Sequence, residues 1–203
     1  MFGKEFTPLA TDYFEEEMNV IRCTQKVIDN FSDSGVLGNG RRIDLNTPEV
    51  WTYDITHVKV LIEPLIGNYR KFISNRGWTP MAGNASGDVM QALSHFSYHV
   101  SYGQLLLCDL QGGVYQNGFI LSDPVIMSPT QNYGPLDLGI DGINSFFSRH
   151  RCGFFCDKQW TKPPSTGPAS YAEPSSDFSL ACSDSQGSAA LETAKMGYAA
   201  GGT

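Results

Sequence analysis

The feature that most constrains this chain is an unbroken apolar run, residues 105–108, that continues into a carboxylate, an amide and paired glycines (LLLCDLQGG). A short apolar run bounded by a turn signal is typical of a buried strand that feeds a loop. A buried strand has no packing reason to end on Asp109 and Gln111, because both are costly in a core unless they form hydrogen bonds or bind something. We therefore expect a functional loop directly after this strand.

A second carboxylate, Asp123, follows one short hairpin later in a Leu-Ser-Asp-Pro turn. Together Asp109, Gln111 and Asp123 offer three oxygen ligands, which is the donor type that Mg²⁺ prefers. A simple capped turn is the alternative interpretation for any single aspartate after a strand. The surrounding motifs favour the cation site.

The composition excludes several classes of function. A length of 203 residues suffices for one domain, or for two small lobes that share a cleft. The net charge of −7 and the pI near 5.0 argue against a nucleic-acid partner. No apolar run approaches a membrane span, and the amino terminus lacks a basic start followed by an apolar core, so we expect no membrane partner. Five irregularly spaced cysteines fit a reducing compartment, and we expect a soluble, cytoplasmic protein.

The first half of the chain predicts one long helix and two strands. From Asp12 onward, apolar residues recur at helical spacing and three glutamates, residues 15–17, crowd the first turns. Residues 51–55 and 57–62 have strand patterns. Because Pro64 cannot donate to a strand ladder, the chain must leave the sheet near Glu63, which would make a natural hinge between lobes.

A metal site is indicated further along the chain. Residues 150–156 have the spacing His-x-Cys-x₃-Cys, which places three zinc-type ligands close together. A helix that we expect to begin at Asp88 carries His95 and His99, and by spacing either histidine can supply the fourth ligand. Free buried thiols beside an unrelated histidine are the alternative. A closed site of four ligands would be structural, and we expect no zinc catalysis from it.

Taken together, these motifs resemble the alpha-kinases, the atypical protein kinases that include myosin heavy chain kinases, elongation-factor kinase and the kinase tails of certain ion channels. The resemblance runs from about Lys4 to Trp160. It is carried by the following motifs, in order: Ile62-Glu63-Pro64; Lys71-Phe72 with Asn75 and Gly77; Leu93-Ser94-His95-Phe96; Asp109-Leu110-Gln111-Gly112; Ser122-Asp123-Pro124; Leu138-Gly139 with Gly142; and His150-x-Cys152-x₃-Cys156.

The resemblance implies a role for each site residue on the nucleotide side. Lys4 is similar to the strand lysine that contacts the α- and β-phosphates of ATP, and Glu17 to the helix carboxylate that orients this lysine. Glu63 and the backbone of Leu65 resemble the hinge that binds adenine.

On the catalytic side, Asp109 resembles the aspartate that positions the acceptor hydroxyl, and Gln111 and Asp123 resemble the Mg²⁺-binding pair. The family's zinc ligands fall on His95, His150, Cys152 and Cys156, which leaves His99 out. The implied reaction is transfer of the ATP γ-phosphate to serine or threonine of a protein substrate.

We therefore expect an α+β, kinase-like fold of two lobes over residues 1–161. The amino-terminal lobe would cover residues 1–62, the hinge residues 63–67, and a zinc-stapled carboxy-terminal lobe residues 68–161. Residues 162–203, rich in Pro, Ser, Gly and Ala, are expected to form a disordered tail.

Relatives have further strands before the lysine, whereas only three residues precede Lys4. The expectation is thus an incomplete amino-terminal lobe, either in a truncated gene product or in a protein that has lost part of its nucleotide site. The alternative to an active kinase is a catalytically impaired pseudokinase, a zinc-stabilised binding module.

Overall fold

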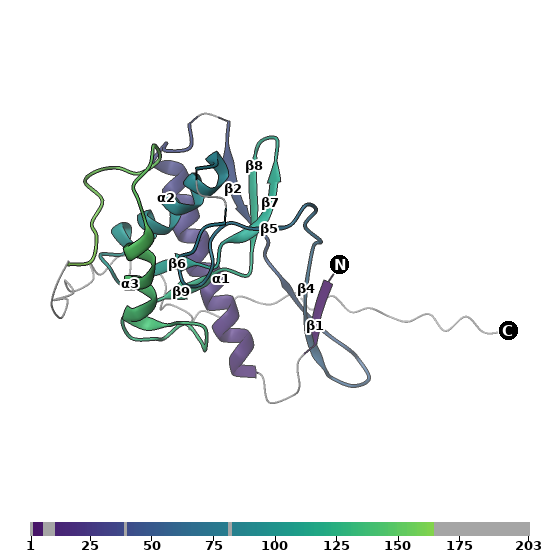
Figure 1. Ribbon diagram of the computed structural model, residues 1–203. Coiled ribbons are helices and arrows are strands. Elements are labelled where there is room, and N and C mark those ends of the chain that lie inside the picture. The colour runs from purple at the N-terminus through teal and green to yellow at the C-terminus, as the bar shows by residue number, and fades with distance from the viewer. Residues whose placement is uncertain (1, 6–10, 39, 81–82, 165–203) are drawn as a thin grey trace.

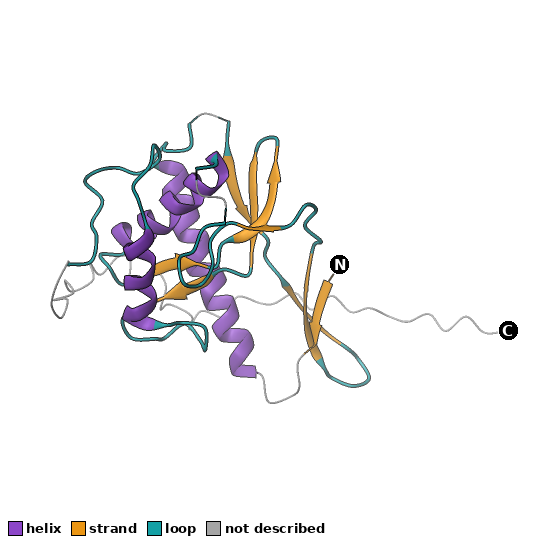
Figure 2. Cartoon of the chain, in the orientation of Figure 1, coloured by secondary structure: helices purple, strands orange, loops and turns teal. Residues whose placement is uncertain are grey.

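A computed structural model describes residues 2–5, 11–38, 40–80 and 83–164 of the chain. Within this part, three helices and nine strands form a mixed fold, which confirms the predicted α+β class. The helices lie on one side of the molecule and the sheet that contains β1 and β4 lies on the other, as Figures 1 and 2 show. None of the described helices combines the length and the apolar character that a bilayer span needs.

One sheet joins the amino terminus to the segment before Pro64. Its three strands are antiparallel and stand in the order β1 (Phe2–Glu5), β4 (Lys59–Glu63), β3 (Glu49–Thr52). In the register of this sheet Lys4 lies opposite Leu61. Strand β4 ends at Glu63, so the chain leaves the sheet where Pro64 predicts, while the hinge role of residues 63–67 stays a prediction.

Two further sheets carry the polar residues that the sequence singled out. The larger has the order β2 (Arg42–Leu45), β8 (Gly118–Ser122), β7 (Gln111–Tyr115), β5 (Arg70–Lys71), and only its β2–β8 pairing is parallel. The smaller pairs β6 (Leu106–Cys108) with β9 (Val125–Met127). All six residues of β6 and β9 are buried, which explains their apolar sequences.

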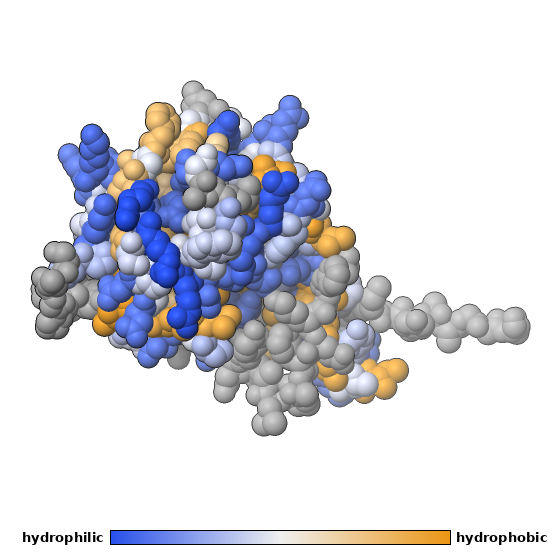
Figure 3. Space-filling model, viewed as in Figure 1, coloured by the Kyte–Doolittle hydropathy of each residue, from blue (hydrophilic) through white to orange (hydrophobic). Residues whose placement is uncertain are grey.

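The helices enclose the core. Helix α1 (Thr11–Asp33) contacts β2 and α2 (Ala85–Val100), α2 packs on β6, and α3 (Gly139–Arg149) contacts β9. Phe31, Leu93 and Phe146, one from each helix, are fully buried in the same core. On the face shown in Figure 3, hydrophilic side chains predominate and hydrophobic ones form small separate patches.

Two sequence-based details differ from the structure. Helix α2 begins at Ala85 because the side chain of Asn84 caps it, accepting a hydrogen bond from the backbone N–H of Ser86 at 2.9 Å. Asp88 therefore lies in the first turn, where its charge favours the helix dipole, and is not the cap. Strand β3 ends at Thr52, and residues 53–58 form the loop of the β3–β4 hairpin, so the predicted strand over residues 51–55 is too long. The predicted disordered tail lies outside the described residues except at positions 162–164.

Candidate functional site

Asp109 and Asp123 each occupy a sharp turn at the end of a buried strand. Asp109 follows β6 with a φ of 51°, and Asp123 follows β8 with a φ of 49°. This left-handed region is open to few residues besides glycine, and aspartate is one of them. The predicted loop after residue 108 is therefore a single tight turn, because Gln111 already begins β7.

Both oxygens of the Asp109 carboxylate are held by neighbouring side chains. Its Oδ1 forms an ion pair with Lys71 Nζ at 2.8 Å, and its Oδ2 accepts a hydrogen bond from Gln111 Nε2 at 3.2 Å. Lys71 and Gln111 are opposite each other in the β5–β7 pairing, so the sheet itself places the two donors side by side. The Asp109 side chain is only 15% exposed. The carboxylate thus has a fixed orientation.

Sequence reasoning missed the partner role of Lys71. The sequence singled out Lys71 only as part of the Lys71-Phe72 motif, whereas the structure pairs it with the Asp109 carboxylate. This motif marked the lysine as a residue of interest. Its ion-pair partner could not be predicted, because nothing in the sequence shows which carboxylate lies opposite Lys71.

A hydroxyl connects Asp123 with Glu63. Ser122 Oγ lies 3.1 Å from Glu63 Oε2 and 3.3 Å from Asp123 Oδ2. The side-chain amide of Asn46 donates to the same Glu63 oxygen at 2.9 Å and to the Pro64 carbonyl at 3.0 Å. The Glu63 side chain is thereby fixed against the turn that contains Asp123.

A pocket lies between α1, the β2–β3 loop and the ends of β4 and β8. It is lined by Glu17, Ile21, Asn46, Pro48, Leu61, Glu63 and Asp123. Three predicted site residues, Glu17, Glu63 and Asp123, therefore share one cavity wall, although they come from distant parts of the sequence. Three carboxylates around a small pocket create a negative potential that attracts a cation.

Lys4 and Leu65 are the other two residues predicted to contact the nucleotide itself. Lys4 lies on β1 opposite Leu61, which lines the pocket, but its side chain lies outside the described part of the structure. The Leu65 side chain is 66% exposed and lines no part of this pocket.

Tyr69 faces the same carboxylates and was not predicted. Its side chain forms a hydrogen bond with Ser122. Burial of the hydroxyl, followed by the negative charges of Asp123, Glu63 and Asp109, raises the pKa of Tyr69 to about 12. The phenol therefore stays neutral at physiological pH.

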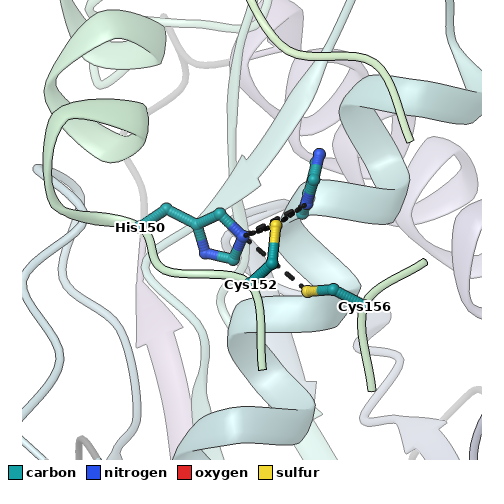
Figure 4. Close-up of side chains that lie close together, drawn as sticks. His150, Cys152 and Cys156 are labelled. Carbon is teal, nitrogen blue, oxygen red and sulfur yellow. Dashed lines mark hydrogen bonds between the residues drawn. The ribbon is translucent and has the colours of Figure 1, made fainter. Parts of the chain in front are cut away.

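The second constellation is a group of four side chains that could hold a metal ion: His95, His150, Cys152 and Cys156. Figure 4 shows the last three converging beside α2. His150 Nε2 lies 3.1 Å from His95 Nδ1, and it lies 3.6 and 3.7 Å from the sulfurs of Cys152 and Cys156. Tetrahedral zinc with ordinary bond lengths places ligand atoms about 3.3–3.8 Å apart. The two His–Cys distances lie in this range, the His–His distance is slightly shorter, and all four ligand atoms lie within 4.8 Å of one another, so the group could hold zinc.

Each histidine of this group has its outer ring nitrogen engaged. His95 Nε2 lies 3.0 Å from the Thr161 carbonyl, and His150 Nδ1 lies 2.6 Å from Gln91 Oε1. Both partners are acceptors, so the outer nitrogens carry the hydrogens and the inner lone pairs point into the cluster. Burial lowers the pKa of His95 to about 4 and that of His150 to about 3, which keeps both rings in the neutral form that binds metal.

The structure also decides between the two histidines of α2. His99 Nδ1 lies 3.3 Å from the hydroxyl of Thr161, and the ring stacks on Trp160 outside the four-residue group. His95 is therefore the residue that joins the cluster.

A third polar centre, at Asp137, was missed. This buried carboxylate accepts hydrogen bonds from the backbone N–H groups of Ser128 and Gly139, both at 2.9 Å, and from the Ser128 hydroxyl at 2.6 Å. It fixes the loop between β9 and α3. An aspartate in a Gly-Pro-Leu-Asp-Leu-Gly stretch gives no pattern by which sequence reasoning could have found this role.

Comparison with known proteins identifies the family. Residues 2–156 match the model of the alpha-kinase family. The chain belongs to the alpha-kinase family. The match includes every predicted site residue, from Lys4 to Cys156.

Characterised alpha-kinases show the likeness in sequence. The chain is 36% identical over 100 residues to alpha-protein kinase vwkA of Dictyostelium discoideum, covering 49% of this chain and 16% of that protein. It is 37% identical over 100 residues to transient receptor potential cation channel subfamily M member 6 of Mus musculus, covering 46% and 5%. The chain thus spans only a small part of the curated relatives it matches.

Solved alpha-kinase structures show the likeness in fold. The alpha-kinase domain of myosin heavy chain kinase A in complex with ADP has a TM-score of 0.58 at 27% identity, with 71% of this chain and 57% of that chain covered. An alpha-kinase from Entamoeba histolytica has a TM-score of 0.63 at 24% identity, with 80% and 70% covered, and this likeness concerns the fold alone.

Proposed function

We propose that this alpha-kinase family member is an ATP-dependent serine/threonine protein kinase, with its active site between the pocket at Glu63 and the turn at Asp109. The observation that carries the proposal is the fixed pair of turns at Asp109 and Asp123, which present two carboxylates from neighbouring strand ends. A related solved structure that contains ADP supports a nucleotide ligand.

The pocket residues would bind the nucleotide. In this proposal Glu63 and the backbone of Leu65 hold adenine, Lys4 contacts the phosphates, and Glu17 orients Lys4. Asp123 and Gln111 would hold Mg²⁺, a hard cation that favours carboxylate and carbonyl oxygens. When bound, Mg²⁺ neutralises charge on the phosphate oxygens.

Asp109 would act on the protein substrate. Its carboxylate accepts the hydrogen of the serine or threonine hydroxyl and orients that oxygen for attack. The ion pair with Lys71 and the hydrogen bond from Gln111 hold the carboxylate in one position. Phosphoryl transfer depends mainly on positioning and charge stabilisation, so a fixed acceptor-orienting group makes a large contribution.

The four-residue His/Cys group would bind zinc in a structural role. Protein ligands would take all four tetrahedral positions around the ion, which would leave no place for a reacting water. Zinc would connect α2 to the segment after α3, and its binding energy would become folding energy.

The test separates Asp109 from Asp123 by measuring ATP affinity and peptide phosphorylation independently. Both are changed to asparagine, which tolerates the left-handed backbone. We expect Asp109→Asn to reduce phosphorylation of a serine/threonine peptide library by about 10²- to 10⁴-fold and to leave ATP affinity nearly unchanged. Asp123→Asn should weaken ATP binding in the presence of Mg²⁺.

Asp54→Asn, in the exposed hairpin loop after β3, is the matched control and should behave like the unchanged chain. Equal losses of ATP affinity in the Asp109 and Asp123 variants would refute the division of roles. ATP binding by the unchanged chain without phosphorylation of any peptide would favour the pseudokinase alternative.

A further inference from the structure

The buried hydroxyl of Ser122 lies between two carboxylates that belong to different segments. Glu63 ends β4, whereas Asp123 forms the turn after β8, and Ser122 Oγ is 3.1 Å and 3.3 Å from their nearest oxygens. A serine hydroxyl has one hydrogen, so it cannot fully satisfy both acceptors at once. The position of this hydrogen therefore depends on which carboxylate carries the more available negative charge.

The Glu63 side of this arrangement is rigid. Asn46 donates to the same Glu63 oxygen that Ser122 reaches, and it also donates to the Pro64 carbonyl. The backbone N–H of Asn46 in turn donates to the Leu121 carbonyl at 2.7 Å, next to Ser122 in β8. Glu63 and Ser122 are thus connected by a closed ring of contacts, which fixes the hydroxyl relative to Asp123.

Tyr69 contacts the serine from the solvent side. Tyr69, whose side chain is 48% exposed, forms a side-chain hydrogen bond with Ser122. The hydrogen bond with Ser122 offsets part of the rise in the Tyr69 pKa, which is the effect of a hydroxyl that donates to the phenol oxygen. The phenol, the serine and the carboxylates then form a chain of polarised hydrogen bonds.

We propose that Ser122 is a positioning residue for cation binding at Asp123, with Tyr69 and Glu63 fixing its hydroxyl. Without a cation, the serine hydrogen stabilises the Asp123 carboxylate in the orientation that a cation requires. When Asp123 binds a cation, its negative charge is compensated and the same hydrogen donates to Glu63. In both states the serine hydrogen or the cation therefore reduces the electrostatic repulsion between the two carboxylates.

This inference rests on the proposed function, because it assigns the partner residues of the cation ligand Asp123. Outer partners of metal ligands commonly contribute about 10- to 100-fold to metal affinity. If Ser122 positions the cation ligand, its removal should weaken ATP binding only when Mg²⁺ is present. If Ser122 only supports the fold, its removal should weaken ATP binding with and without Mg²⁺, so the two roles can be told apart by measuring ATP affinity under both conditions.

The experiment measures the dissociation constant of ATP by isothermal titration calorimetry, first with Mg²⁺ and then with EDTA, on the full chain. The ratio of the two constants reports the contribution of the cation. We expect Ser122→Ala to reduce this ratio about 10- to 100-fold with little change in the EDTA value. Ser122→Thr keeps the hydroxyl and should keep the ratio.

Tyr69→Phe provides a second variant, since its ring is half-exposed and the change removes only the phenol. It should reduce the ratio in the same direction as Ser122→Ala but by less. Tyr53→Phe, an exposed tyrosine of the β3–β4 hairpin, is the matched control and should leave the ratio unchanged.

The outcomes separate the inference from the proposed function. If the unchanged chain binds ATP equally with Mg²⁺ and with EDTA, the cation site itself is refuted and the inference falls with it. If the unchanged chain depends on Mg²⁺ and Ser122→Ala keeps the full ratio, only the inference is overturned. If Ser122→Ala fails to fold by circular dichroism, a full ratio in Tyr69→Phe overturns the inference and a reduced ratio supports it.

Discussion

Removing one ligand of the His/Cys group is the perturbation whose size can be worked out from the structure. The metal would join His95 to His150, which are 55 residues apart. Closing a loop of this length restricts the unfolded chain by about 4 kcal/mol on the chain-entropy relation for cross-links. A chain of this size loses roughly 2–4 °C in Tm for each kcal/mol, so full loss of the staple should lower Tm by roughly 8–16 °C.

The variant is Cys152→Ala, assayed by thermal unfolding and by metal content from mass spectrometry. Phe154→Ser is the matched control, because Phe154 lies in the same loop between the two cysteines but is 92% exposed. We expect the unchanged chain and the control to contain one zinc per chain and to share a Tm that a chelator lowers. An unchanged chain without zinc, with the same Tm as Cys152→Ala, would refute the structural zinc site.

Three more predictions follow from buried groups outside the proposed active site. Gly77→Ala should destabilise the fold by about 2–4 kcal/mol in urea unfolding, because Gly77 has a φ of 76° and a Cβ there would lie 2.5 Å from the Cα of Phe146. Asp137→Ala should cost about 3 kcal/mol by the same assay, since it leaves buried N–H donors without an acceptor, whereas a change within 0.5 kcal/mol would contradict the capping role. In a chelator, the free energy of unfolding should fall as pH drops from about 6.5 toward 4. The unfolded chain then takes up protons at His95 and His150 while burial holds their folded pKa values near 4 and 3, and a flat profile between pH 7.5 and 5 would contradict this.

Local patterns predicted the elements that carry the site. The apolar run before Asp109 forms the buried strand β6, and Asp123 does follow the next hairpin. The spacing of residues 150–156 predicted three members of the His/Cys group that could hold a metal ion, and the family resemblance selected His95 as the fourth. These features depend on residues close in sequence, or on a motif with a fixed order.

Contacts between distant segments could not be predicted in the same way. The ion pair of Lys71 with Asp109 requires the β5–β7 pairing, and the contact of Glu63 with Ser122 requires two different sheets to meet. Asn84 and Asp88 are both good helix caps, so only the observed backbone shows that Asn84 is used. Sequence patterns describe what a residue can do, whereas its partner is set by the tertiary structure.

The folded unit extends beyond Cys156. Trp160 is buried against Phe31 and Phe96, and the Thr161 carbonyl accepts the outer hydrogen of His95. Trp160 and Thr161 lie beyond residue 156, the last position of the family match. A domain boundary drawn at Cys156 would keep all four residues of the His/Cys group and yet remove the carbonyl that fixes the tautomer of His95.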